Sequence, residues 1–238
     1  MLPYSARIGQ HGTMLWEWPN TGNQVFILDL DGTLIPSAGV DDRCFWQAVR
    51  DCYGEPTVSP DLHGFRNVTD SGILNDWCQL ELGHPPGAEE TLQIRQRFLD
   101  LLKAAWKSEP EHFTPLPGVT AWLEAVQSRS NVFAGIATGG WGHSARLKLE
   151  LAGLGRFDIP LASSDEAVPR SDIMRIAARR TYQDQADGEA VFTYVGDGPW
   201  DLEASRKLDW NFIGIASGER AEQLRKAGAT HVHVDFLK

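Results

Sequence analysis

The chain has 238 residues, of which 42% are hydrophobic, enough for one core of ordinary size and a smaller second lobe. It carries 22 Lys and Arg against 32 Asp and Glu, and this net charge of −10 disfavours nucleic acid polymers and anionic membrane surfaces as partners. No apolar run approaches the roughly 20 residues of a membrane span, and the first residues lack the pattern of a signal peptide, so we expect a cytoplasmic protein.

Residues 1–23 contain several prolines and glycines and show no sustained hydrophobic periodicity. We therefore expect an irregular N-terminal extension before the first strand. The sequence indicates no function for this extension.

The first predicted strand is the apolar run Val25–Leu28, which is typical of a strand buried in a parallel sheet. Asp29 and Asp31 follow it directly, and Gly32 indicates a turn. Both carboxylates then leave the sheet at its carboxyl edge, where open α/β sheets bind ligands. Two acids this close repel each other unless a cation or a shared proton compensates them. We expect a phosphate-handling site here.

Three helices are predicted next, over residues 41–53, 69–82 and 88–106. In the third, Leu92, Leu99, Leu102 and Trp106 recur at helical spacing. We interpret residues 39–115 as a helical lobe inserted after the first strand.

The three cysteines, Cys44, Cys52 and Cys78, are odd in number and form no CxxC pattern. This spacing indicates neither a disulfide framework nor a zinc site, and we expect free thiols.

From residue 116 onward, short apolar strands alternate with helices. The predicted strands are 132–137, 160–162, 191–195, 212–216 and 231–234, and the predicted helices begin near residues 117, 143, 172, 200 and 220. This alternation predicts an α/β fold with a parallel sheet covered by helices on both faces. The core would comprise residues 24–38 and 116–238.

A second acidic group follows the predicted strand 191–195. Asp197 leaves the strand end, and Pro199 is suited to open a helix whose first turn contains Asp201. Either aspartate alone is more often a turn former or a helix cap. Together with Asp29 and Asp31 they would place four carboxylates at one rim, and all-oxygen ligation suits a hard cation such as Mg²⁺.

Two further elements complete a phosphate site. Thr138 and Gly139 end the strand 132–137 and offer a hydroxyl group and backbone N–H groups. Arg170 precedes a predicted helix and would supply positive charge, although a solvated arginine at the start of a helix is the plainer interpretation. Three arginines further along that helix compete for the role, though we expect them on its solvated face: Arg175, Arg179 and Arg180.

In this order, DLDGTL at 29–34, the strand ending in Thr138, the basic residue before a helix and GDGPWD at 196–201 resemble the haloacid dehalogenase superfamily, in particular its phosphoglycolate phosphatase-like members. The resemblance covers residues 24–236. It implies a Rossmann-like core and an inserted α-helical cap.

The resemblance also implies roles for individual residues. Asp29 would be the nucleophile that forms an aspartyl-phosphate, and Asp31 the general acid and then base. Thr138, Gly139 and Arg170 would bind the phosphate. The Mg²⁺ ligands would be Asp29, the backbone carbonyl of Asp31, and Asp197, with Asp201 acting through water or by orienting the others.

The third motif departs from the family pattern. The family most often has a lysine before proline there, whereas Val168 stands before Pro169 in this chain and Arg170 follows it. An arginine is accepted in some relatives, so Arg170 remains the expected cation.

Substrate selection is expected in the lobe, where residues 63–67 and Asp70 would contact the leaving group. Four tryptophans at apolar helix positions are expected in the core: Trp46, Trp77, Trp106 and Trp122. Trp141 and Trp200 each follow a strand end and are expected to wall the entrance.

The resulting hypothesis is a Mg²⁺-dependent phosphomonoester hydrolase acting on a small phosphorylated metabolite. Two alternatives stay open. One is a phosphoglucomutase-like phosphotransferase, which returns the phosphoryl group to a second hydroxyl. The other is a non-catalytic phosphate-sensing protein on the same fold.

Overall fold

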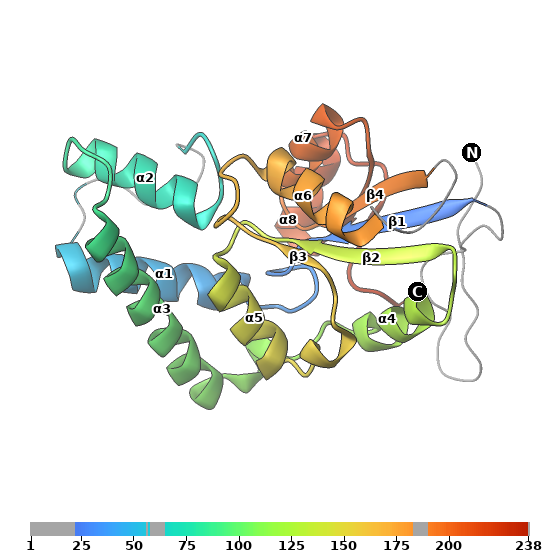
Figure 1. Cartoon of the computed structure of the whole chain (residues 1–238), viewed down its shortest axis with the longest axis horizontal. Helices are drawn as coiled ribbons and strands as arrows, with labels where there is room; N and C mark the ends of the chain where they lie inside the picture. Colours follow the sequence, from blue (N-terminus) through green and yellow to red (C-terminus); the bar gives the residue numbers. More distant parts are fainter. Residues whose placement is uncertain (1–21, 56, 58–64, 183–189, 238) are drawn as a thin grey trace.

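A computed structural model describes residues 22–55, 57, 65–182 and 190–237. Six parallel strands form one sheet in the order β3-β2-β1-β4-β5-β6 (Figure 1). Their bounds are β1 Asn23–Leu28, β2 Val132–Ala137, β3 Leu161–Ala162, β4 Ala190–Gly196, β5 Asn211–Ile215 and β6 Val232–His233. The predicted parallel α/β sheet is confirmed.

Strand β1 lies in the middle of the sheet and is apolar on both faces. Phe26 and Leu28 belong to one buried cluster, whereas Val25 and Ile27 belong to another, as the alternation of side chains along a strand requires. Residues of α4 (Val119–Gln127) and α5 (Gly142–Leu151) complete the first cluster. Residues of α6 (Arg170–Tyr182) and α7 (Pro199–Lys207) complete the second. Helix α8 (Gly218–Lys226) packs near the β5–β6 edge.

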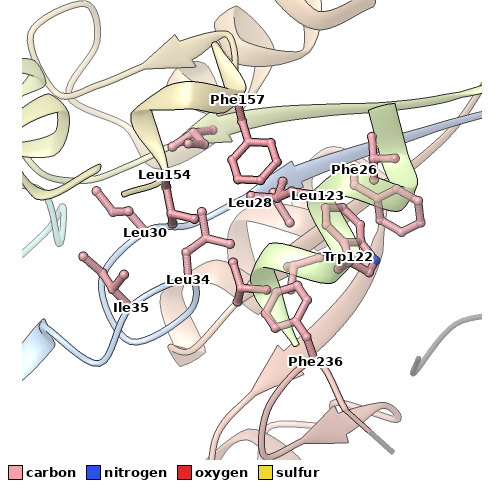
Figure 2. Packing of buried hydrophobic residues seen from close by; sticks show 14 of the residues in the cluster. Phe26, Leu28, Leu30, Leu34, Ile35, Trp122, Leu123, Leu154, Phe157 and Phe236 are labelled. Carbon is pink, nitrogen blue, oxygen red and sulfur yellow. The ribbon is translucent and has the colours of Figure 1, made fainter. Parts of the chain in front are cut away.

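Trp122 of α4 belongs to the first cluster and packs beside Phe26 and Phe236 (Figure 2). Its ring lies edge-on to Phe26 at 5.4 Å between centroids and to Phe236 at 5.7 Å. The backbone N–H of Phe236 donates to the carbonyl oxygen of Pro117 at 3.0 Å. These contacts join the end of the described chain to the central strand.

Helices α1 (Ala38–Tyr53), α2 (Asp70–Glu81) and α3 (Ala88–Ser108) lie together beside one end of the sheet (Figure 1). They enclose their own buried cluster, which includes Phe45, Trp77 and Phe98. Two short 3₁₀ turns, Pro110–Phe113 and Gly155–Phe157, were not predicted. We call α1–α3 the helical lobe.

The apolar stripe of α3 differs from the predicted one. Its buried residues are Ile94, Phe98, Leu102 and Ala105, whereas Leu92 is 66% exposed and Trp106 is 39% exposed. The prediction that Trp106 lies in the core was therefore wrong: the leucines suggested a stripe rotated away from the one that faces α1.

The three cysteines of the lobe are free, as expected. Among the residues that the structure describes, no helix has the length and apolar character needed to cross a membrane. The expected N-terminal extension, apart from residues 22 and 23, lies outside the described residues.

Candidate active site

Asp29 follows the last residue of β1 and is buried between the ends of the neighbouring strands. Its backbone N–H donates to the carbonyl oxygen of Val195 at 2.8 Å, which continues the pairing with β4. One carboxylate oxygen accepts from Arg170 Nη1 at 3.1 Å and the other from Thr33 Oγ1 at 3.4 Å. The side chain is thus fixed at the carboxyl edge of the sheet, where the sequence predicted it.

Asp197 and Asp201 join Asp29 in one buried acidic cluster, in which one ligand oxygen from each residue lies within 4.8 Å of the others. Asp197 follows β4, and Asp201 lies in the first turn of α7, where its Oδ2 accepts from the backbone N–H of Gly198 at 3.0 Å. The loop after β1 passes close by, because a Cβ on Gly32, whose φ is +83°, would lie 2.5 Å from Asp197 Oδ2.

The cluster holds more negative charge than its surroundings compensate. Burial and the charge of Asp201 raise the pKa of Asp29 well above the usual range, and the same two causes raise the pKa of Asp197 to about 7. Burial also raises the pKa of Asp201, against the opposing charge of Arg170. Three carboxylates facing one guanidinium form an all-oxygen donor set, which fits a hard divalent cation.

Arg170, the first residue of α6, connects several parts of the site. Its Nη1 contacts Asp29 Oδ1 at 3.1 Å and Asp201 Oδ1 at 3.0 Å, and its Nη2 donates to the carbonyl oxygen of Val68 at 3.0 Å. Burial disfavours its charge, but Asp201 and Asp29 outweigh this and raise the pKa of Arg170. Tyr194 Oη, which donates to the carbonyl oxygen of Ala137 at 2.9 Å, lies 3.4 Å from Nη1.

The competing arginines of α6 face away from this cluster. Arg175 pairs with Asp172 at 2.6 Å, and Arg180 pairs with Glu166. Arg179 is exposed. The expectation that these residues lie on the solvated face of the helix is confirmed.

The Thr138–Gly139 turn ends β2 beside Asp29. Thr138 is buried, and its Oγ1 accepts from the backbone N–H of Gly140 at 3.0 Å. A Cβ on Gly139 would lie 2.5 Å from Arg170 Nη2 and 3.0 Å from the carbonyl oxygen of Val68. Only a glycine lets this turn, Arg170 and the chain before α2 meet so closely.

The start of α2 binds the same turn. The backbone N–H of Asp70 donates to the carbonyl oxygen of Gly139 at 2.8 Å, and Asp70 Oδ2 accepts from the backbone N–H of Trp141 at 2.9 Å. Asp70 was expected to contact a leaving group, but both its backbone and its side chain are used to hold the lobe against the sheet. Phe65 packs on Trp46, and residues 63 and 64 lie outside the described chain.

Asp31 has a different set of partners from the acidic cluster. Its Oδ1 accepts from Ser37 Oγ at 2.5 Å and its Oδ2 from Lys148 Nζ at 2.5 Å, and Lys148 also contacts Asp41 Oδ1 at 2.5 Å. Sequence reasoning missed Lys148 and Asp41. One feature of the sequence could have indicated that Lys148 is buried: it lies beside Ala145 and Leu149, which are on the buried stripe of α5.

The two tryptophans expected at the entrance differ. Trp141 is only 2% exposed, packs with the lobe cluster, and donates from its indole N–H to Ser71 Oγ at 3.0 Å, so its expected place at the entrance was wrong. Trp200 is half-buried, with the Arg220 guanidinium 5.2 Å from its ring centroid. That Trp200 forms a wall of the site entrance stays a prediction.

Comparison with known proteins supports the same fold. Residues 24–209 match the family described as haloacid dehalogenase-like hydrolases. No curated protein matches the chain.

Solved structures similar to this chain include a hydrolase from Pseudomonas syringae, with 23% identity, a TM-score of 0.67 and coverage of 89% of this chain and 93% of that one. A predicted phosphoglycolate phosphatase from Haemophilus somnus has 16% identity, a TM-score of 0.59 and coverage of 92% and 96%. A candidate β-phosphoglucomutase from Bacteroides vulgatus has 18% identity, a TM-score of 0.64 and coverage of 90% and 85%.

Proposed function

The chain belongs to the haloacid dehalogenase-like hydrolases, and from this we propose that it is a Mg²⁺-dependent phosphomonoester hydrolase acting on a small phosphorylated metabolite. The observation that carries the proposal is the arrangement around Asp29. A buried carboxylate at a strand end contacts a partly buried guanidinium and lies beside two more carboxylates. A carboxylate is a competent nucleophile toward phosphorus when positive charge offsets the repulsion between the anions.

In the first step, an Asp29 oxygen attacks phosphorus and the bond to the ester oxygen breaks, which leaves an aspartyl-phosphate. Asp31 carries the proton that the departing alcohol needs. Arg170 and the Thr138–Gly139 turn bind the phosphoryl oxygens through the guanidinium, the hydroxyl group and the backbone N–H groups. The short chain between Asp29 and Asp31 keeps both carboxylates at the same edge of the sheet.

In the second step, Asp31 acts as the base. It takes a proton from a water molecule whose oxygen attacks phosphorus, and the bond to Asp29 breaks to release inorganic phosphate. Asp31 then holds a proton again and Asp29 carries no phosphoryl group, so both residues have returned to their starting states.

The residues that would hold the metal are Asp29, the backbone carbonyl of Asp31, and Asp197, with Asp201 orienting them or acting through water. The raised pKa values of Asp29 and Asp197 support this, because a divalent cation would relieve the same unfavourable charge that raises them. When bound, Mg²⁺ supplies positive charge that reduces the repulsion between the nucleophile and the phosphoryl oxygens.

The predicted cap, residues 39–115, would select the substrate. Supporting this, Val68 lies two residues before α2 and its carbonyl oxygen accepts from Arg170, so this part of the chain reaches the guanidinium proposed to bind phosphate. A cap this close to the site would favour a small leaving group.

The test is phosphate release from a panel of phosphomonoesters, measured with Mg²⁺ and with a chelator. We expect release that requires Mg²⁺ and is lost in Asp29→Asn, whereas Asp158→Asn, at an exposed position, keeps full activity. Release by Asp29→Asn at the rate of the unaltered chain would refute the assignment of the nucleophile.

A phosphoglucomutase-like activity is the second candidate, because a candidate β-phosphoglucomutase is among the similar structures. Isomerisation of a sugar phosphate that depends on a catalytic amount of sugar bisphosphate, without net phosphate release, would support it. Phosphate binding with no turnover in either assay would instead favour a sensor.

A further inference from the structure

Lys148 is a buried cation beside the proposed acid/base residue. It lies on α5, its side chain is 0% exposed, and its ammonium group contacts Asp31 Oδ2 and Asp41 Oδ1, each at 2.5 Å. Burial lowers the pKa of Lys148, but the charges of Asp31 and Asp41 outweigh this and keep the lysine charged.

The contacts of Lys148 fix the orientation of Asp31. Ser37 Oγ donates to one carboxylate oxygen of Asp31 at 2.5 Å and Lys148 donates to the other, so the carboxylate plane is held at two points. Both carboxylate oxygens are held by these contacts, so the side chain cannot rotate without breaking one of them.

Asp41 anchors the lysine from the other side. It lies in the first turn of α1, the helix through which the chain enters the lobe, whereas Asp31 belongs to the loop after β1. Lys148 therefore joins three segments: the loop of the sheet, the first helix of the lobe and α5. Asp70 of α2 also faces this group and contributes to its charge.

We propose that Lys148 is a positioning residue that holds Asp31 as the base for hydrolysis of the aspartyl-phosphate. The inference rests on the proposed function. A purely structural role explains the pairing less well, because buried ion pairs are often replaced by apolar residues without loss of stability. The presence of Lys148 and Asp41 beside Asp31 serves the orientation of that carboxylate.

The experiment separates the two half-reactions with 4-nitrophenyl phosphate, whose leaving group departs without protonation. Rapid acid quenching followed by mass spectrometry measures the rate at which the phosphorylated chain forms and, after removal of substrate, the rate at which it decays. Variants are Lys148→Met and Asp41→Asn. Arg146→Met, which removes an exposed cation from the same helix, is the matched control.

We expect decay of the phosphorylated chain to slow at least about tenfold in Lys148→Met, because a positioned general base contributes about 10²–10⁴-fold. Formation should change less than about threefold, and the inhibition constant of inorganic phosphate should stay constant. Asp41→Asn should also slow decay more than formation, but by a smaller factor. If Lys148→Met does not fold, the result for Asp41→Asn decides whether Lys148 positions Asp31.

Equal slowing of both half-reactions, or unchanged decay, would overturn the role of Lys148 while the phosphatase proposal stands. If the unaltered chain forms no phosphorylated species and releases no 4-nitrophenolate, both proposals fail together.

Discussion

Replacing Asp197 by Asn should stabilise the metal-free protein, and the gain should depend on pH. Burial and Asp201 raise the pKa of Asp197 in the folded chain from 3.8 to about 7. Between these two values the folded state binds a proton that the unfolded state has released. The contribution of Asp197 to stability therefore falls as the pH rises from about 4 to about 7.

The size of the effect follows from that difference in pKa. Each pKa unit corresponds to about 1.4 kcal/mol, so full ionisation of Asp197 costs at most about 4 kcal/mol. The side chains of the cluster share their protons, and relaxation reduces the cost, so we expect a measured gain of about 1–3 kcal/mol at pH 8. At pH 4 the aspartate is protonated in the folded chain, and the variant and the unaltered chain should have nearly equal free energies of unfolding.

The assay is urea unfolding in the presence of a chelator, followed by tryptophan fluorescence between pH 4 and pH 8. The informative quantity is the difference in unfolding free energy between Asp197→Asn and the unaltered chain, because the titration of groups that do not interact with Asp197 cancels from it. Asp158→Asn, at an exposed position with φ of +47° that asparagine tolerates, is the control for the loss of one carboxylate. A difference for Asp197→Asn that does not grow with pH would refute the reasoning.

Two further predictions concern packing. Trp122→Ala should lower the free energy of unfolding by about 3–5 kcal/mol in urea, because it removes the ring between Phe26 and Phe236, and a cost below about 1 kcal/mol would contradict the packing described. Gly139→Ala should reduce phosphate release at least about tenfold, because its Cβ would meet Arg170 Nη2 at 2.5 Å, whereas Gly39→Ala, which has no atom within 4 Å of the added carbon, should retain activity.

The sequence predicted the strands and the acidic cluster because both depend on local patterns. A short apolar run followed by Asp and Gly indicates a buried strand and its end, and parallel strands bring such ends to one edge. The sequence therefore predicts that Asp29, Asp197 and Asp201 lie together, and one ligand oxygen from each does lie within 4.8 Å of the others. The same reasoning placed Arg170 near them, despite the missing lysine at Val168.

The sequence did not predict the contacts that depend on how the lobe meets the sheet. Lys148 appears as an ordinary helical lysine until Asp31 and Asp41 are brought to it from segments more than 100 residues away. Asp70 likewise appears to be a free carboxylate until Trp141 donates to it. In α3, leucine spacing alone did not determine which face packs on α1, because Leu92 and Trp106 are as apolar as the residues that are buried.

The central place of β1 determines when it can be completed during synthesis. Its partners β2 and β4 follow it along the chain, and the edge that pairs with β4 has no partner until residue 196 has been made. At roughly 5–20 residues per second, the ribosome needs about 10–40 s to reach that point. The helices of the lobe have local contacts and can form earlier. Until β4 has been made, one edge of β1 stays unpaired and can pair with a wrong strand. A nascent chain that stops before β4 would therefore hold the nucleophile candidate Asp29 on an unfinished sheet, prone to bind chaperones or other chains.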